Sequence, residues 1–169
     1  MGLDISYYRN IKKTDAVFDE DRNPIDPHTR EILDDVYIPS LNHPIFRDRS
    51  DGVEEGVYEY DFCGSFRVGS YSGYNHWREE LAKGGGYPKY ADSYAEGAWN
   101  HYDNGPFWEL INFSDCEGFI GPKTSLKLFK DFEKYEKEFE PHNEYFKKIY
   151  DNFKEAFKVA SENGVVDFH

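Results

Sequence analysis

Apolar and polar residues alternate near the start of the chain, which is the pattern of a strand. Over residues 2–8, the apolar positions are Leu3, Ile5 and Tyr7, and side chains two positions apart share one face of a strand. Residues 57–68 carry a similar pattern and predict a strand or a hairpin. Residues 165–168 predict a short final strand.

The clearest helical pattern lies in the C-terminal third of the chain. After Pro122, a residue suited to the first turn of a helix, apolar side chains recur at steps of three and four residues. The predicted inward stripe is Leu126, Phe129, Phe132, Tyr135 and Phe139. Pro141 ends this helix. A second helix is predicted over residues 142–162, with these residues facing inward: Phe146, Ile149, Phe153, Phe157 and Ala160.

The middle of the chain has weaker patterns. Residues 75–83 predict an amphipathic helix that ends at the glycines of residues 84–86. Residues 91–101 predict a shorter helix, and residues 107–113 predict a strand followed by a loop over residues 114–121. Residues 14–56 are acidic and rich in proline, which breaks regular structure, so we expect loops there with one short element between residues 29 and 38.

Together these elements predict an α+β fold in one domain, residues 1–169. We expect a small, mostly antiparallel sheet built from residues 2–8, 57–68, 107–113 and 165–168. Helices should cover one of its faces, including a C-terminal helical hairpin.

Composition supports a folded core. Aromatic residues make up 18% of the 169 residues, and each ring buries a large area. No apolar run reaches the roughly 18 residues of a membrane span, and the first residues lack the apolar stretch of a secretory signal. Two cysteines are too few for a disulfide scaffold. We therefore expect a cytoplasmic protein with reduced thiols, without a membrane partner and without a cofactor.

The charge distribution limits the possible classes of binding partner further. The net charge is −13, and most of it lies in residues 15–61, whereas residues 122–162 are balanced. Duplex nucleic acid is a poor partner, because neutralising phosphates needs a basic face. The acidic surface is either a solvated surface or a docking surface for a basic protein.

The first candidate site is the run of residues 69–78, where serines and glycines alternate with aromatics before a helix. A small-residue turn at a helix start offers N–H groups to an anion. The aromatic rings could stack on a planar ligand, and an arginine could hold phosphate. The candidate residues are Ser70, Tyr71, Ser72, Tyr74, Asn75, Trp77 and Arg78. The same pattern also fits a simple turn whose aromatics pack in the core.

The second candidate site is the loop of residues 112–118, a polar stretch before a long helix. Loops at such junctions are common ligand positions. The candidate residues are Asn112, Ser114, Asp115, Cys116 and Glu117. They could bind ligand donors, supply a nucleophile at Cys116 if a histidine lay near, or form a structural turn. The six histidines show no local metal-binding spacing, so no metal site is predicted.

Four blocks together resemble a family of small phage and prophage proteins without an established activity. They are residues 1–5 (MGLDI), 69–78 (GSYSGYNHWR), 112–122 (NFSDCEGFIGP) and 163–169 (NGVVDFH). The resemblance implies a phage or prophage accessory protein in the bacterial cytoplasm, in a class that often counters host defences.

Three functions remain as hypotheses. The first is a module that binds a small nucleotide-like ligand, as an anti-defence protein that sequesters a signal and forms a homodimer. The second is an acidic inhibitor or DNA mimic that docks on a host defence protein. The third is a small hydrolase that uses the loop from Ser114 to Glu117.

Overall fold

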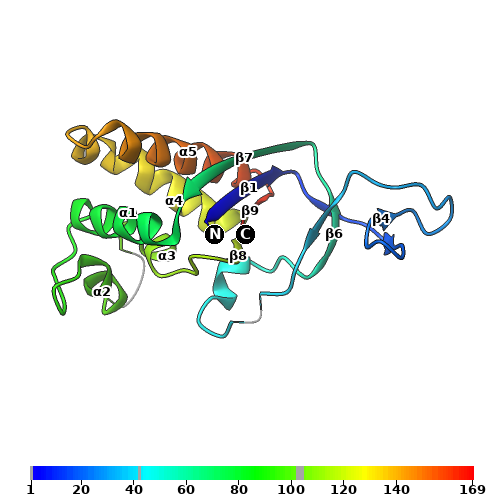
Figure 1. Ribbon diagram of the computed structural model, residues 1–169, viewed down its shortest axis with the longest axis horizontal. Coiled ribbons are helices and arrows are strands. Elements are labelled where there is room, and N and C mark those ends of the chain that lie inside the picture. The colour runs from blue at the N-terminus through cyan, green and yellow to red at the C-terminus, as the bar shows by residue number, and fades with distance from the viewer. Residues whose placement is uncertain (1, 42, 102–104) are drawn as a thin grey trace.

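The computed structural model describes residues 2–41, 43–101 and 105–169. Met1, part of the opening motif, and Asn42, in the predicted irregular stretch, lie outside the described residues. The fold is α+β, as predicted, with antiparallel sheets and helices. Figure 1 shows a body of sheet and helices from which a thinner part of the chain projects to the right.

The central sheet holds four antiparallel strands in the order β7-β1-β9-β8, which lie from top to bottom in Figure 1. They are β7 (Phe62–Gly69), β1 (Leu3–Arg9), β9 (Val165–Phe168) and β8 (Gly118–Ile120). The predicted first and last strands are confirmed, and they are neighbours, so the two ends of the chain lie side by side. Alternation holds as expected: Leu3 and Ile5 are fully buried.

The predicted C-terminal hairpin is present. Helix α4 (Pro122–Tyr135) and the 3-10 turn η2 (Glu136–Phe139) lead to α5 (Glu144–Ala160), which packs against α4 and the sheet. Asn143 begins α5, because its side chain accepts a hydrogen bond from the N–H of Phe146 at 2.9 Å. All five inward residues predicted for α5 are buried. In α4, however, Leu126 is exposed and Leu128 takes the core position.

Two further helices precede the hairpin. Helix α1 (Tyr71–Gly84) begins four residues before its predicted start, because Ser70 caps it by accepting from the N–H of Gly73 at 3.1 Å. Helix α2 (Tyr94–Trp99) lies within the predicted weaker helix. Ser93 caps it and accepts from the N–H of Glu96.

The predicted strand over residues 107–113 is wrong. This segment contains a short helix, α3 (Trp108–Ile111), preceded by Phe107 in the left-handed conformation at φ 56°. The N–H of Phe107 donates to the Asp131 carboxylate at 3.0 Å, which fixes this start from outside the segment. A short apolar run does not distinguish a strand from a buried helical turn. The fourth strand is instead β8, inside the predicted loop.

The predicted strand or hairpin over residues 57–68 spans two sheets. β6 (Gly56–Glu59) pairs with β2 (Lys12–Lys13) and β5 (Val36–Ile38) in a small three-stranded sheet, whereas β7 belongs to the central sheet. β5 is the short element expected between residues 29 and 38. The 3-10 turn η1 (Arg47–Ser50) follows it.

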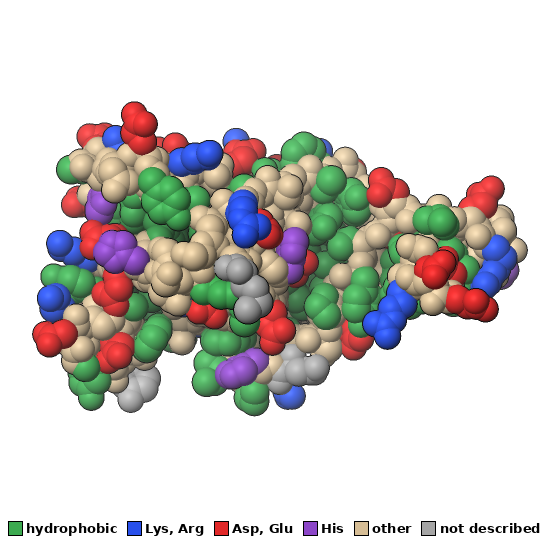
Figure 2. All heavy atoms as spheres, viewed as in Figure 1, with side chains coloured by type: hydrophobic (Ala, Val, Ile, Leu, Met, Phe, Trp, Pro, Cys, Tyr) green, Lys and Arg blue, Asp and Glu red, His purple; other side chains and the backbone are tan. Residues whose placement is uncertain are grey.

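Beyond the small sheet, residues 14–35 form what we call the arm. Its regular structure is the pair β3 (Val17–Phe18) and β4 (Pro24–Ile25), with two residues in each strand. Figure 2 shows acidic and hydrophobic side chains together on this projecting part.

The central sheet separates two cores. The larger lies between the sheet and the helices and is mostly aromatic, with Phe153 stacked on Trp77 at 5.2 Å between ring centroids. The smaller lies on the opposite face, where Val165 and Phe119 pack with Ile38 and Tyr58 of the small sheet. The small sheet is thus anchored to the body, and the arm extends from it.

Candidate functional site

The aromatics of the first candidate segment lie mostly in the core. Tyr74 and Trp77 are 0% and 2% exposed, and the indole N–H of Trp77 donates to the carbonyl of Phe146 at 3.3 Å. Tyr71 is partly buried against the same core. Protein therefore covers the ring faces of Tyr74 and Trp77, and in this structure they offer no stacking surface to a ligand.

The turn before α1 is occupied by its own side chains. The Ser70 hydroxyl caps the helix and lies 3.2 Å from the Ser72 hydroxyl. The Tyr145 hydroxyl, from α5, donates to the carbonyl of Val68 at 2.9 Å beside this turn. These contacts explain Ser70, Ser72 and Gly73 as parts of a strand-to-helix turn.

Arg78 connects the two candidate segments. Its side chain is 5% exposed, and Nη1 donates to the carbonyls of Ile111 at 3.2 Å and Phe113 at 2.7 Å. The guanidinium also lies 4.6 Å from the ring centroid of Tyr74. Carbonyls at a helix C-terminus lack intrahelical partners and carry partial negative charge. Arg78 therefore holds the end of α3 and the start of the loop against α1.

A second arginine also holds the end of α3 and the start of the loop. Arg49, in η1, is buried and donates to the carbonyls of Glu109 at 3.3 Å and Asn112 at 3.0 Å. Its guanidinium lies 4.7 Å from the ring centroid of Trp108. Sequence reasoning missed this residue, because nothing in its acidic, proline-rich surroundings distinguishes it from a surface arginine.

The loop itself folds around Ser114. The Ser114 hydroxyl accepts from the N–H groups of Cys116 at 3.3 Å and Glu117 at 3.2 Å. Gly118 follows at φ +110°, where a Cβ would lie 3.1 Å from both Leu41 and Phe113. Only glycine adopts this conformation readily, so the sequence of the loop dictates its path.

A polar pocket of about 490 Å³ lies where the two segments meet. The Asn75 amide donates to Asp115 at 2.9 Å and accepts from Arg78, so a chain of hydrogen bonds runs along the wall. Trp99 lines the pocket as well and donates to the carbonyl of Ile111 at 3.1 Å. Four of the predicted residues line it: Asn75, Arg78, Ser114 and Asp115.

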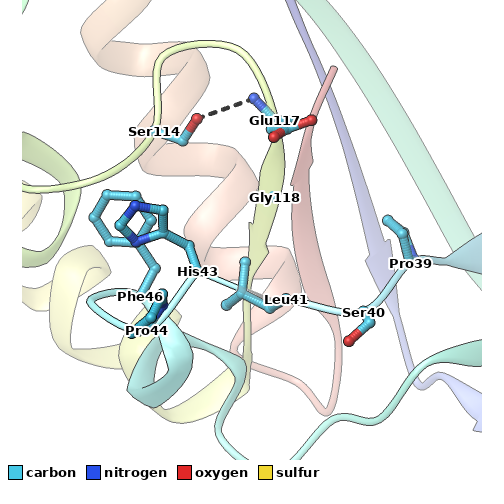
Figure 3. A pocket seen from close by; sticks show the side chains of 9 residues that line it. All are labelled: Pro39, Ser40, Leu41, His43, Pro44, Phe46, Ser114, Glu117 and Gly118. Atoms are coloured by element: carbon cyan, nitrogen blue, oxygen red, sulfur yellow. Dashed lines mark hydrogen bonds between the residues drawn. The ribbon is translucent and has the colours of Figure 1, made fainter.

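An aromatic pocket of about 470 Å³ lies on the other side of the loop. Figure 3 shows Ser114 and Glu117 on one side, and the rings of His43 and Phe46 on the other. These rings are stacked, with centroids 4.5 Å apart, and Phe46 also contacts the ring of Phe113 at 5.1 Å. Ser114 lines both pockets, so the loop is their common wall.

The carboxylates around the pockets determine their electrostatics. Glu79 accepts from the N–H groups of Tyr94 at 2.8 Å and Ala95 at 3.3 Å, and so caps α2. Asp115 and Glu117 belong to the common wall. Against these three carboxylates stands the single guanidinium of Arg78, already bonded to carbonyls. The site therefore attracts hydrogen-bond donors more than it attracts phosphate.

The phenol of Tyr74 is neutral at ordinary pH. Burial raises its pKa to about 12, while Arg78 opposes the rise and Asp115 adds to it. Its hydroxyl has no hydrogen-bond partner among the described residues. Tyr74 is thus a structural neighbour of the polar pocket and does not act as a base.

Catalytic and metal-binding arrangements are sparse. Cys116 is exposed, with its sulfur 3.6 Å from the Ser114 hydroxyl, and no hydrogen bond of the described residues joins it to a histidine. In the described part of the chain, no group of three His, Cys, Asp or Glu residues is placed to hold a metal ion. Among the same residues, no helix is both long and apolar enough to cross a bilayer.

Comparisons of the chain with protein-family models, with curated proteins and with solved structures find no match.

Proposed function

We propose that the protein binds a small, planar, donor-rich ligand of the nucleotide-like class, and that it holds this ligand without altering it. The observation that carries the proposal is the common wall: one loop, residues 112–118, lines both the aromatic pocket and the polar pocket. Each volume lies within the range of known ligand pockets, about 300–1,000 Å³.

The aromatic pocket suits the base of such a ligand. The stacked rings of His43 and Phe46 replace the aromatics of α1 as the stacking surface, and stacking a base on an aromatic ring contributes about 1–3 kcal/mol. Glu117 lies in the same pocket. Its carboxylate accepts hydrogen bonds, as an exocyclic amine of a base requires.

The polar pocket suits a sugar better than a phosphate chain. Asn75 and Asp115 present an amide and a carboxylate to hydroxyl groups. Asp115 and Glu79 oppose a phosphate, and so does the net charge of −13. We therefore expect affinity to fall from nucleosides to cyclic nucleotides and to be lowest for linear triphosphates.

The biological setting is also part of the proposal. The resemblance to phage and prophage proteins suggests an accessory protein in a bacterial cytoplasm that withholds a signal molecule from a host defence. Binding without turnover is what such a role needs.

Calorimetry with adenosine, guanosine, cytidine, cyclic AMP and ATP tests the proposal. Phe46→Leu keeps an apolar side chain but removes the stacking ring, so it should weaken binding by about tenfold or more. Asp115→Asn should narrow the difference between adenosine and ATP, because it removes one of the opposing charges. Glu20→Gln, on the arm, is the matched control and should bind as the unmodified protein does.

Two results would decide against the proposal. The absence of heat and of thermal stabilisation with the whole panel would exclude this ligand class. Conversion of a nucleotide by catalytic amounts of protein, detected by mass spectrometry, would favour the hydrolase hypothesis instead. Unaltered melting temperatures of the variants would establish that any loss of binding is local.

A second candidate function is docking of the arm on a basic protein. The arm carries eight acidic residues against Arg22 and Arg30, together with exposed apolar side chains such as Ile32, which is 70% exposed. Apolar groups ringed by one sign of charge are typical of an interaction surface.

Fluorescence titration with a synthetic peptide of alternating Lys and Leu tests the second candidate. Binding should weaken steeply with salt. It should be lost when Asp34 and Asp35 of the arm are changed to Lys together with Glu54 and Glu55, which directly precede β6, yet remain in Tyr74→Ala. Equal binding of a Glu-Leu peptide, or retained binding after charge reversal, would refute docking through the arm.

A further inference from the structure

Strand β7 is an edge of the central sheet. It is eight residues long and pairs with β1 on one side. Within residues 2–41, 43–101 and 105–169, no strand pairs with its other side, and Figure 1 shows it as the outermost strand of the sheet. An unpaired edge of this length is a template for another strand unless charges, prolines or bulges protect it. β7 holds one charged residue, Arg67, and no proline, and its register with β1 shifts between Leu3 and Asp4, which lie opposite Gly69 and Arg67 at its C-terminal end.

The sequence of this edge is complementary to itself. Residues 61–67 read Asp-Phe-Cys-Gly-Ser-Phe-Arg. When two copies run antiparallel with Gly64 opposite Gly64, each phenylalanine faces a phenylalanine and each Cys63 faces Ser65. At the ends, each Asp61 faces an Arg67. Opposite charges, and aromatic pairs on directly opposed residues, stabilise an antiparallel pair of strands.

We propose that a second copy of the chain pairs with β7 about a two-fold axis at Gly64, which joins the two sheets into one. Two-fold symmetry requires a surface that complements itself, and residues 61–67 meet that condition. The proposal is independent of the proposed function, because the pockets lie on other elements.

The two faces of the sheet agree with this register. Phe66 is opposite the buried Ile5 of β1, and its ring meets Phe153 of α5 at 5.1 Å between centroids. Because side chains alternate, Phe62 and Phe66 share the helix-covered face, where Phe62 is 43% exposed. Cys63, Ser65 and Arg67 share the opposite face, so both members of the Phe62–Phe66 pair, and both members of the Cys63–Ser65 pair, lie on one face. Asp61 stands in the bend directly before β7.

The ends of the edge set the limits of the pairing. Beyond Arg67, the Tyr145 hydroxyl occupies the carbonyl of Val68 at 2.9 Å, which closes that end. Asp61 and Arg67 each make one ion pair within the chain, with Arg9 and with Asp4, both at 2.9 Å. All four side chains are partly exposed there, and surface pairs of this kind are weak, so a second partner can be added without burying an unpaired charge.

Disulfide trapping tests the register. In a Cys116→Ser background, Ser65→Cys places Cys63 of one copy directly opposite the new cysteine of the other. Cβ atoms of opposed residues lie about 4.5–5.5 Å apart, close to the reach of a disulfide. Mild oxidation should give a covalent dimer of twice 19.9 kDa. Thr29→Cys, an exposed position on the arm, is the matched control and should give none.

Charge reversal tests the same register without oxidation. Arg67→Glu places like charges opposite Asp61 at both ends of the pair, and should raise the dimer dissociation constant by about tenfold. The double variant Asp61→Lys/Arg67→Glu should restore it. A protein that stays at 19.9 kDa in light scattering at its highest soluble concentration would overturn the proposal. A dimer whose dissociation constant does not change in Arg67→Glu, or that fails to cross-link through Ser65→Cys, would also overturn it.

Discussion

The body and the arm use the same kinds of residue in opposite ways. In the body, Phe153 is fully buried, and its ring neighbours include those of Trp77 and Phe157. In the arm, Phe18 is 45% exposed, and its ring packs against that of Tyr37. Two strands of two residues cannot enclose an apolar core. The body therefore supplies most of the free energy of folding, and the arm contributes little to it.

The largest effect should come from emptying the aromatic core. Phe153→Ala removes a fully buried ring and leaves a cavity, which should lower the free energy of unfolding by about 3–5 kcal/mol. Urea denaturation followed by tryptophan fluorescence measures it. A loss below about 1 kcal/mol would mean that the core is not packed as described.

Removing the hydrogen bonds by which Arg78 holds the loop should have the next largest effect. Arg78→Met removes the donor to the carbonyl of Phe113, and leaving a buried carbonyl without a partner costs about 1–3 kcal/mol. Arg22→Met, on the arm, is the matched control and should change stability by less than about 0.5 kcal/mol. Equal losses of unfolding free energy from both changes would contradict the role of Arg78 in holding the loop.

Carboxylates in the two regions should respond to pH with opposite signs. In the body, burial raises the pKa of Asp167 to about 7. The folded protein then retains a proton that the unfolded chain has released, so this residue lowers stability as pH rises from about 4 to about 7. Asp167→Asn should therefore be stabilising at pH 8 relative to the unmodified protein, and the difference should shrink towards pH 4.

In the arm, the hydrogen bond from the Asn23 side chain lowers the pKa of Asp19 below its ordinary value. Its contribution is present at neutral pH and is lost as pH falls through the lowered pKa. Nuclear magnetic resonance titration of the two carboxyl groups measures both shifts. Shifts of the same sign would contradict the contrast between buried and exposed carboxylates.

The smallest effect should come from the arm's own apolar residues. Phe18→Ala removes a ring that solvent already reaches, so stability should fall by no more than about 1 kcal/mol. The urea midpoint of this variant, set beside that of Phe153→Ala, gives the contrast directly. A loss comparable with that of Phe153→Ala would show that the arm is part of the core.

Local patterns predicted much of the body. Alternation located β1, and the three- and four-residue steps located α5 with all its inward residues. The same rules failed at residues 107–113, because the conformation there depends on Asp131, a residue far along the chain. The local sequence pattern cannot indicate a hydrogen-bond partner that is so distant along the chain.

The structure brings residues of the two candidate segments together, because hydrogen bonds join Asn75 to both Arg78 and Asp115. Their role in binding stays a prediction. The structure also buries Tyr74 and Trp77 in the core, so the proposed function assigns stacking to His43 and Phe46 instead. Those two lie in a proline-rich segment without periodicity, and only its path across the body places them opposite residues 112–118.

The most direct test of the ligand-binding account is a titration of the labelled protein with adenosine, followed through its backbone amide resonances. The account predicts shifts at residues 43–46 and 114–118, on both sides of the common wall, and none in the arm, residues 14–35. The absence of shifts up to the solubility limit of adenosine, or shifts confined to the arm, would contradict it.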